Sequence, residues 1–317
     1  MNHSANIPDG QHTSTPDADY HVPVMLEECI AALEIKTDGI YVDCTFGGGG
    51  HSRGILKKLG PDGKLIVFDQ DAAVKINLPD DGRLVFVQQN FRHLKKFLRV
   101  NKVLAVNGIL ADLGVSSHQF DEPERGFSTR FESKLDMRMD PRQQLTAAHI
   151  LNTYDAAALH KLFERYGEVT NAKTLANRIV TIRKTNPIET VSQFRQAVYG
   201  EVKGNPHKYF AQVFQALRIE VNNEIGALKE MLAQVAEVLK PGGRVAIISF
   251  HSLEDRIVKH FFRHGGDEED KDDLFGNKPE TELIIINKKP IVASAEEMKQ
   301  NSRSRSAKLR IAAKKIF

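Results

Sequence analysis

The stretch "YVDCTFGGGGHS" spans residues 41–52 and contains four consecutive glycines, Gly47–Gly50. An apolar run precedes these glycines, and a helical pattern, "HSRGILKKL", follows them. Four glycines together are costly, because glycine loses more backbone freedom on folding than any other residue. A loop between a strand and a helix N-terminus offers backbone N–H groups to polar or anionic ligands. The stretch therefore predicts a ligand-binding loop whose backbone another group approaches closely.

Two cofactor classes use a loop of this kind. A dinucleotide fold has G-x-G-x-x-G, but here the sixth position counted from Gly47 is Ser52, so that fingerprint is incomplete. Methyltransferases that depend on S-adenosylmethionine typically show D-x-x-x-G-x-G, and Asp43, Gly47 and Gly49 fit that spacing. The loop alone favours S-adenosylmethionine and leaves NAD open.

Two further residues follow predicted strands on the cofactor side. Asp69 ends the second strand run, nineteen residues after Gly50, where an acid can accept hydrogen bonds from ribose hydroxyls. A strand-terminal Asp can instead cap a helix. Phe91 follows the third run and could pack on adenine or in the core.

Asp112 ends the fourth strand run, in "LADLGVSS". The carboxyl end of the strands is where ligands bind in open α/β folds. Methyltransferases acting on exocyclic amines often hold an acid or Asn, then Pro-Pro-aromatic, at this position. Here "DLGV" keeps only the acid, so Asp112 is the candidate catalytic group.

Short apolar or β-branched runs recur along the chain and predict seven strands. Helical patterns separate the first four, which indicates a parallel sheet covered by helices. The runs are "GIYVDCTF" (39–46), "GKLIVFD" (63–69), "RLVFVQQ" (83–89), "NGILADLG" (107–114), "RVAIISF" (244–250), "ELIIIN" (282–287) and "AKLRIA" (307–312).

Residues 120–207 contain no good strand run and predict a helical insert domain after the fourth strand. The α/β domain then comprises residues 21–119 and 208–317, after a tail of residues 1–20 rich in Ser, Thr, Asp and Pro that we expect to be disordered. From Phe210 to Leu239 apolar residues recur at helical spacing. The pattern allows a break in this helix near 222–226, and "KPGG" (240–243) stops it.

Composition sets the broad class. The 317 residues are 41% hydrophobic and 27% charged, as in soluble globular proteins. No apolar run reaches the ~20 residues of a membrane span, and residues 1–20 lack the parts of a signal peptide. The two cysteines, Cys29 and Cys44, form no disulfide or metal pattern, so we expect a cytoplasmic protein without a metal.

Seven longer strings occur in one order, and together they resemble the bacterial small-subunit ribosomal RNA cytosine-N4 methyltransferase family, also called the MraW or RsmH family. The resemblance runs from about His21 to Ala313. The strings are "HVPVMLEECI" (21–30), "DCTFGGGGHS" (43–52), "ADLGVSSHQFDEPERGFS" (111–128), "LDMRMD" (135–140), "FQALRIEVNNE" (214–224), "ISFHSLEDRIVK" (248–259) and "NSRSRSAKLRIA" (301–312).

The resemblance implies a seven-stranded, Rossmann-like class I methyltransferase sheet with a helical insert. It implies S-adenosylmethionine as cofactor and a cytosine N4 amine in the decoding region of 16S ribosomal RNA as target, within an assembled or near-assembled small subunit. The partner is thus small-subunit ribosomal RNA, without a membrane, and the oligomeric state stays open. By motif, the implied cofactor contacts are Gly49, Gly50, His51, Asp69, Phe91, Asp112 and Gln119.

Methylation at N4 needs alignment and a hydrogen-bond acceptor for the amine. Asp112 is the first candidate acceptor, and the backbone carbonyls of Leu113 and Gly114 are alternatives. The target base must leave any stack to enter the pocket. No thiolate adduct is needed, unlike methylation at ring C5.

Several features keep two interpretations. In "FHSLEDR", Ser252 with Asp255 could cap a helix or the motif could serve the site. Arg138 could meet RNA phosphate or pair with Asp136 or Asp140. The insert carries Arg178, Arg183, Lys184, Lys203 and Lys208, and residues 302–317 carry six Lys or Arg and no acid; both segments could dock RNA or form solvated surface.

Competing functions are a methyltransferase acting on DNA cytosine or protein, an RNA-binding assembly factor without turnover, and an NAD oxidoreductase. The incomplete dinucleotide fingerprint argues against the oxidoreductase. The Asp43, Asp69 and Asp112 set argues against an inactive enzyme.

Overall fold

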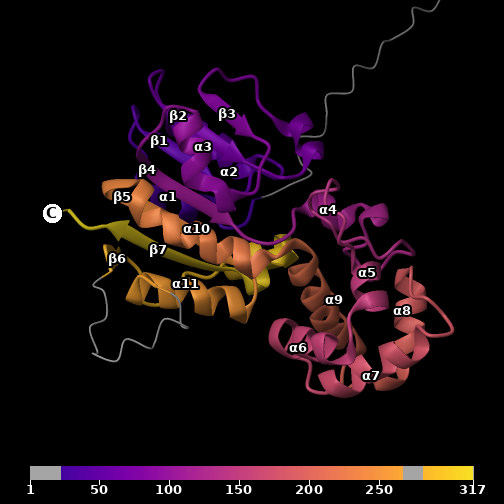
Figure 1. Ribbon diagram of the computed structural model, residues 1–317. Helices are drawn as coiled ribbons and strands as arrows, with labels where there is room; N and C mark the ends of the chain where they lie inside the picture. The colour runs from indigo at the N-terminus through magenta and orange to yellow at the C-terminus, as the bar shows by residue number, and fades with distance from the viewer. Residues whose placement is uncertain (1–22, 267–280, 317) are drawn as a thin grey trace, which may run out of the picture.

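A single sheet contains all seven predicted strand runs in the computed structural model, which describes residues 23–266 and 281–316 (Figure 1). The sheet order is β3-β2-β1-β4-β5-β7-β6. The strands are β1 (Ile40–Asp43), β2 (Lys64–Phe68), β3 (Leu84–Val87), β4 (Val106–Asp112), β5 (Leu239–Ser249), β6 (Leu283–Ile285) and β7 (Lys308–Lys314).

Strands β1 to β5 are parallel, whereas β7 is antiparallel to both β5 and β6. The strand order reverses at β1, with β2 on one side and β4 on the other. This is the topology at which open α/β sheets bind ligands beyond the carboxyl ends of the strands. The predicted fold class is confirmed.

The two faces of the sheet bury alternate residues of each strand, as the two-residue period of a strand requires. In β2, Leu65 and Val67 pack in one core with α1 (Leu26–Leu33) and α2 (Gly50–Lys58). Ile66 and Phe68 pack in the other core. The helices over that second core are α3 (Leu94–Val100), α10 (Glu224–Val238) and α11 (Ser252–His264).

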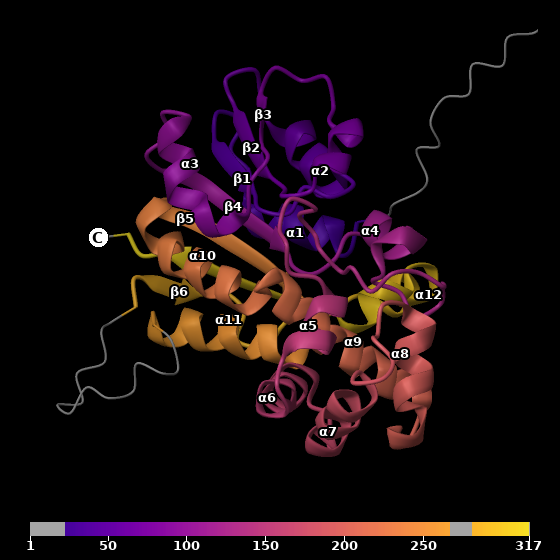
Figure 2. The ribbon, with the colours of Figure 1, turned by 45° about the vertical axis from the view of Figure 1, so that its right-hand side comes forward.

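The insert is a helical unit with its own apolar core, to one side of the sheet (Figures 1 and 2). Short helices bring the chain out of β4 and back toward the sheet. The insert elements are α4 (Ser117–Asp121), α5 (Ala147–Thr153), α6 (Ala156–Gly167), α7 (Ala172–Ile182), α8 (Val191–Val198) and α9 (Pro206–Asn222).

The long helical pattern after Phe210 is two helices, α9 and α10. The break falls at Asn223, whose φ of 47° is left-handed and ends α9, a conformation that Asn tolerates better than most residues. Helix α10 already ends at Val238, and "KPGG" lies within β5. Because Phe210, Val213 and Leu217 of α9 belong to the insert core, we propose that the insert extends to Asn223 and does not end at residue 207.

The expected tail of residues 1–20 lies outside the described residues. So does most of the stretch 265–276, which contains six acids and one Lys. A short helix, α12 (Ala295–Gln300), and a 3₁₀ turn (Ser302–Ser306) lead into β7. They bring the end of the chain to the rim of the ligand edge, where Arg303 and Ser306 line a cavity.

Candidate functional site

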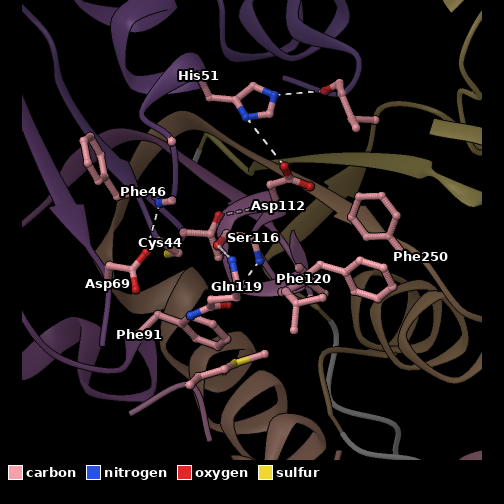
Figure 3. Close-up of a pocket in the computed structure, with 18 of the residues that line it drawn as sticks. Cys44, Phe46, His51, Asp69, Phe91, Asp112, Ser116, Gln119, Phe120 and Phe250 are labelled. Atoms are coloured by element: carbon pink, nitrogen blue, oxygen red, sulfur yellow. Dashed lines mark hydrogen bonds and ion pairs between the residues drawn. The ribbon is translucent and has the colours of Figure 1, made fainter. Parts of the chain in front are cut away.

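A cavity of about 320 Å³ opens beyond the carboxyl ends of the parallel strands (Figure 3). It is lined by the loops after β1 to β5, by the start of the insert and by the segment before β7. Six of the seven predicted cofactor contacts line it: Gly50, His51, Asp69, Phe91, Asp112 and Gln119. The seventh, Gly49, is not among the lining residues.

The four glycines have separate reasons to be glycine. Gly47 and Gly49 have φ of 50° and 73°, a left-handed backbone that side chains disfavour. Gly50 is needed for close packing, because an added Cβ would lie 2.8 Å from Cγ of Pro23. The group that approaches the backbone at Gly50 is thus part of the protein, whereas Gly47 and Gly48 face the cavity.

Asp43 fixes the two ends of the glycine loop through hydrogen bonds. It is buried, and its two carboxylate oxygens accept hydrogen bonds from Thr45 N (3.0 Å) and Ser52 Oγ (2.7 Å). These bonds join the end of β1 to the first turn of α2. Asp43 is therefore a residue that shapes the loop rather than one that lines the cavity.

Asp69 lies at the end of β2, against the glycine loop. Its oxygens accept hydrogen bonds from Gly47 N and Asp71 N, both at 2.9 Å. Burial raises the pKa of Asp69 to about 6. The alternative capping role belongs to Asp71, whose side chain accepts from Ala73 N at the start of a 3₁₀ turn.

The position of Phe91 is compatible with packing on adenine and with packing in the core. It is half-buried, lines the cavity, and packs against the apolar core under α3 and α10. A flat apolar surface at this place, beyond β3, suits the face of a nucleobase.

Gln119 links the insert to the sheet. Its Nε2 donates to Asp71 Oδ2 at 2.8 Å, and its Oε1 accepts from Ser116 N at 3.2 Å. Arg125 donates to the same Asp71 oxygen at 2.8 Å. Gln119 is buried, and its amide is committed to the protein, so its main effect is to fix the loop after β4 against the loop after β2.

Asp112 and His51 form the polar centre of the cavity (Figure 3). His51 Nε2 lies 2.9 Å from the Val24 carbonyl oxygen, which it can reach only as a donor, and His51 Nδ1 lies 3.8 Å from Asp112 Oδ2. The other oxygen, Oδ1, is buried and has no hydrogen-bond partner among the described residues. Burial raises the pKa of Asp112 to about 6, although His51 opposes the shift. Asp112 thus lines the cavity with a side chain that is 21% exposed, and one of its oxygens is unsatisfied within the part of the chain that the structure describes.

Several lining residues were missed by the sequence reasoning, among them Phe120, Arg218, Phe250 and Arg303. Phe250 and Phe120 lie on the side of Asp112 away from Asp69 (Figure 3). Arg303 donates to Asp121 Oδ2 at 2.8 Å, and its guanidinium lies over the Phe120 ring, 5.8 Å from the centroid. Phe250 could have been found, because it follows β5 as Asp112 follows β4. Arg218 could not, because its helix gives no sign of where its polar face points.

The interpretation of "LDMRMD" is settled in favour of an ion pair. Arg138 Nε and Nη2 each lie 2.7 Å from an oxygen of Asp136, and Arg138 Nη1 donates to the carbonyls of Pro141 and Gln143. The guanidinium fixes a turn and is not free for a phosphate.

The expected cap in "FHSLEDR" was wrong by one residue. The N-cap of α11 is His251, whose Nδ1 accepts from Glu254 N, while the Glu254 side chain accepts from His251 N. Ser252 is the first helical residue instead, and its Oγ donates to Glu168.

The basic C-terminal segment is also different from a free RNA-binding arm. Much of it is β7, and its cations pair with acids of the sheet domain. Asp255 binds Arg310 at 2.6 Å and Lys308 at 3.4 Å, and Lys314 lies 3.6 Å from Glu282. These contacts remove most of the basis for RNA docking by this segment.

No helix within residues 23–266 and 281–316 is long and apolar enough to cross a membrane. The model of the MraW methylase family matches residues 18–315. The chain is 52% identical over 301 residues to "Ribosomal RNA small subunit methyltransferase H" of Christiangramia forsetii, covering 93% of this chain and 98% of the relative. A protein of the same name from Parabacteroides distasonis is 52% identical over 301 residues (94% and 98% covered). A third, from Flavobacterium johnsoniae, is 50% identical over 302 residues (95% and 99% covered).

Proposed function

The chain belongs to the MraW methylase family and is a methyltransferase that depends on S-adenosylmethionine, and we propose that it methylates the N4 amine of a cytosine in the decoding region of small-subunit ribosomal RNA. The relatives' shared name supports the small-subunit RNA. The position on the RNA and the N4 atom rest on the family resemblance and on the chemistry of the cavity. The observation that carries the proposal is the unpartnered, buried oxygen of Asp112 at the end of β4.

The cavity fits S-adenosylmethionine. Asp69 places a carboxylate where ribose hydroxyls can donate to it, Phe91 offers an apolar face, and Gly47 and Gly48 leave the loop backbone open. Bound S-adenosylmethionine supplies a methyl group on a positively charged sulfur, which is already a strong electrophile. The protein therefore needs to align the acceptor nitrogen and remove its proton, and alignment alone can contribute ~7–11 kcal/mol.

Asp112 suits the amine of cytosine in two ways. The N4 lone pair is delocalised into the ring, and an acceptor for the amino N–H favours a nitrogen whose lone pair is free. The Asp112 carboxylate, which lines the cavity, can be such an acceptor. When N4 gains a methyl group it carries one proton too many, and the Asp112 carboxylate can take it. The backbone carbonyls of Leu113 and Gly114 stay the alternative acceptors.

His51 positions Asp112 and influences its charge. Its Nε2 is held by Val24, so Nδ1 is the atom that faces the carboxylate.

Methylation at ring C5 does not fit this cavity. That reaction needs a thiolate, and Cys44 is the cysteine that lines the cavity. Burial, and then the charge of Asp43, raise the pKa of Cys44 far above its ordinary value, so its thiol stays protonated. N4 chemistry is the reaction that the side chains support.

The test is methyl transfer from labelled S-adenosylmethionine to separate substrates: unmodified small ribosomal subunits, naked 16S RNA, DNA and protein. We expect label in the small subunits and N4-methylcytidine in their digested nucleosides. Label only in DNA or protein would overturn the substrate, 5-methylcytidine would overturn the reacting atom, and cofactor binding without transfer to any substrate would leave an assembly factor. Assembled particles labelled faster than naked RNA would support a late assembly substrate.

A further inference from the structure

Two of the strings quoted above, "FQALRIEVNNE" and "ISFHSLEDRIVK", meet in one largely buried polar cluster beside the cavity. Arg218, near the C-terminus of α9, donates from Nε to Glu224 Oε1 (2.8 Å) and from Nη2 to Glu224 Oε2 (3.0 Å). His251 and Glu254, at the start of α11, complete the cluster, with His251 Nε2 3.2 Å from Glu254 Oε1. One ligand atom each of Glu224, His251 and Glu254 lie within 4.8 Å of one another.

Arg218 supplies the positive charge of this cluster. Its side chain is 18% exposed and that of Glu224 10%. Burial acts to lower the pKa of the Arg218 guanidinium, but Glu224 and Glu254 outweigh it and raise the pKa. A buried guanidinium held on two sides by acids is fixed in charge and in direction. The cluster thus anchors Arg218 rather than leaving two carboxylates for a metal ion.

The anchored guanidinium faces the cavity. Arg218 lines the cavity, and because Nε and Nη2 serve Glu224, the edge that carries Nη1 is the one available to a bound molecule. Glu254 also accepts a hydrogen bond from Phe250 N at 2.9 Å. Arg218 and Phe250 are therefore two parts of one wall: Arg218 binds Glu224, Phe250 binds Glu254, and the two glutamates lie in one cluster.

This wall lies on the substrate side of Asp112. In the sheet, Asp112 pairs with Ile248, so Phe250 lies two residues beyond the partner of Asp112. Asp69 ends β2, which β1 separates from β4. Asp112 thus stands between Asp69, on the cofactor side, and Phe250 of the wall (Figure 3).

We propose that Arg218 is a specificity-determining residue that donates a hydrogen bond from Nη1 to the ring-acceptor edge of the target cytosine, N3 or O2, while Asp112 accepts from N4. This inference rests on the proposed function. Cytosine presents a hydrogen-bond donor at N4 next to an acceptor at N3. This pair matches the acceptor of Asp112 and the donor of Arg218. Uracil presents an acceptor at O4 and a donor at N3, so the contact of Asp112 and a contact of Arg218 to N3 would both be mismatched, whereas a contact to O2 would not discriminate. Phe250 provides an apolar face on which the extruded base packs.

The test uses unmodified small ribosomal subunits as the probe and four variants: Arg218→Met, Arg218→Lys, Glu224→Gln and the control Lys173→Met. Lys173 is an exposed lysine of α7, so its loss removes a positive charge away from the cavity. For each variant, kcat, subunit affinity and its salt dependence, and S-adenosylmethionine affinity by calorimetry are measured, with thermal melting as the check on folding.

We expect Arg218→Met to lower kcat by about 10- to 100-fold, the scale of one base-edge contact, with both affinities within about twofold of the wild type. Arg218→Lys keeps the positive charge but loses the paired N–H donors of the guanidinium. Glu224→Gln keeps the guanidinium but weakens its ion pair with residue 224. Both should lie between Arg218→Met and the wild type. Lys173→Met should match the wild type. Should Arg218→Met fail to fold, the two conservative variants decide.

Three results would overturn the proposal. Weaker S-adenosylmethionine binding would assign Arg218 to the cofactor. Weaker subunit binding with a shallower salt dependence and unchanged kcat would assign it to a phosphate. No change in any quantity would make the cluster structural only. The wild type reports on the proposed function separately: if it forms N4-methylcytidine while Arg218→Met is unimpaired, this inference fails and the function stands.

Discussion

At the scale of single residues, Asp112 combines two roles that oppose each other. Its carboxylate lines the cavity and has one oxygen without a partner among the described residues, which suits a hydrogen bond from an amine. Burial of the carboxylate raises its pKa to about 6 and so disfavours the charged form that the reaction needs. His51, 3.8 Å away, offsets part of this shift.

Asp112→Asn should lower kcat by about 100-fold, a loss comparable with removing one group that stabilises the transition state. Cofactor affinity should change by less than about threefold, because only the transition state requires the charged acceptor. Single-turnover methyl transfer and calorimetry measure the two quantities. Equal losses in both would restrict Asp112 to cofactor binding and pass the acceptor role to a backbone carbonyl.

The raised pKa of Asp112 also predicts a pH dependence of folding. In the unfolded chain an Asp titrates near 3.9, so between about pH 4 and 6 the folded state holds the proton more tightly. Stability from this group is therefore complete below pH 4 and is lost as pH rises through about 6. The Asn variant cannot lose it. Relative to wild type, Asp112→Asn should gain about 3 kcal/mol above pH 6 and nothing at pH 4, measured by urea unfolding. A difference that does not vary with pH would contradict this.

Asp69 has a separate role on the cofactor side. Asp69→Ala should weaken S-adenosylmethionine binding by ~1.5–3 kcal/mol, the scale of hydrogen bonds to a charged group. Asp81→Ala is the matched control, because Asp81 pairs with Arg83 outside the cavity lining. Calorimetry at pH 7.5 measures both variants. If both bind the cofactor like wild type, the ribose is held elsewhere.

At the scale of elements, the loop that leaves β4 is held to the sheet at one polar point and then makes a tight turn. Asp71 receives both Gln119 and Arg125. Gly126, with φ of 70°, ends the 3₁₀ turn Pro123–Arg125 directly after Arg125. There, an added Cβ would overlap the Lys134 carbonyl oxygen. The insert is thus positioned by a turn that only glycine can make.

Gly126→Ala should destabilise the protein by about 2–4 kcal/mol, because a left-handed backbone with a Cβ is strained and the overlap is with backbone. Gly200→Ala is the control: it lies in the same insert, without a left-handed φ and with no atom within 4 Å of the added Cβ. Chemical denaturation and hydrogen exchange of α5 to α9 measure the effect. A Gly126→Ala protein as stable as Gly200→Ala would mean that this turn is free to rearrange.

The same elements show how far sequence reasoning reaches. The strands could be predicted, because apolar runs such as Leu65–Phe68 must bury both faces of a parallel strand. The α11 cap could not, since His251 and Ser252 can each accept from a backbone N–H and only the packing of Glu254 selects between them. Asp112 was predicted from its place at a strand end. Arg218 was not predicted, because its orientation depends on an ion pair with Glu224. Glu224 lies beyond a helix break whose position the sequence gives only approximately.

At the scale of the whole molecule, the two basic segments differ in how many of their cations form ion pairs. Those of β7 pair with acids of the sheet domain, whereas Lys184, Lys203 and Lys208 of the insert are exposed. The insert leaves the sheet directly after Asp112 and contributes Gln119 and Phe120 to the cavity. A folded RNA that delivers a base to this cavity would pass over the insert.

Reversing Lys184, Lys203 and Lys208 to Glu together should weaken binding of small subunits and flatten its salt dependence, because each lost phosphate contact removes roughly 0.7–0.9 from the slope of log affinity against log salt. Cofactor affinity should not change. The control is the triple reversal of Lys36, Lys57 and Lys58, exposed residues at the opposite, amino edge of the parallel strands. Filter binding at salt concentrations from about 50 to 300 mM measures the affinity and salt dependence of both triple variants. Equal behaviour of the two triple variants would place the RNA surface elsewhere.

The order of strands in the sheet also has a consequence for synthesis. β7 lies between β5 and β6, yet it is the last of the seven to leave the ribosome. Until it emerges, β5 has an unpaired edge, β6 has nothing to pair with, and Arg303 has only just reached the rim of the cavity. A nascent chain therefore cannot complete its sheet, or the cavity wall that the segment before β7 supplies, until β7 itself has been synthesised and has left the ribosome.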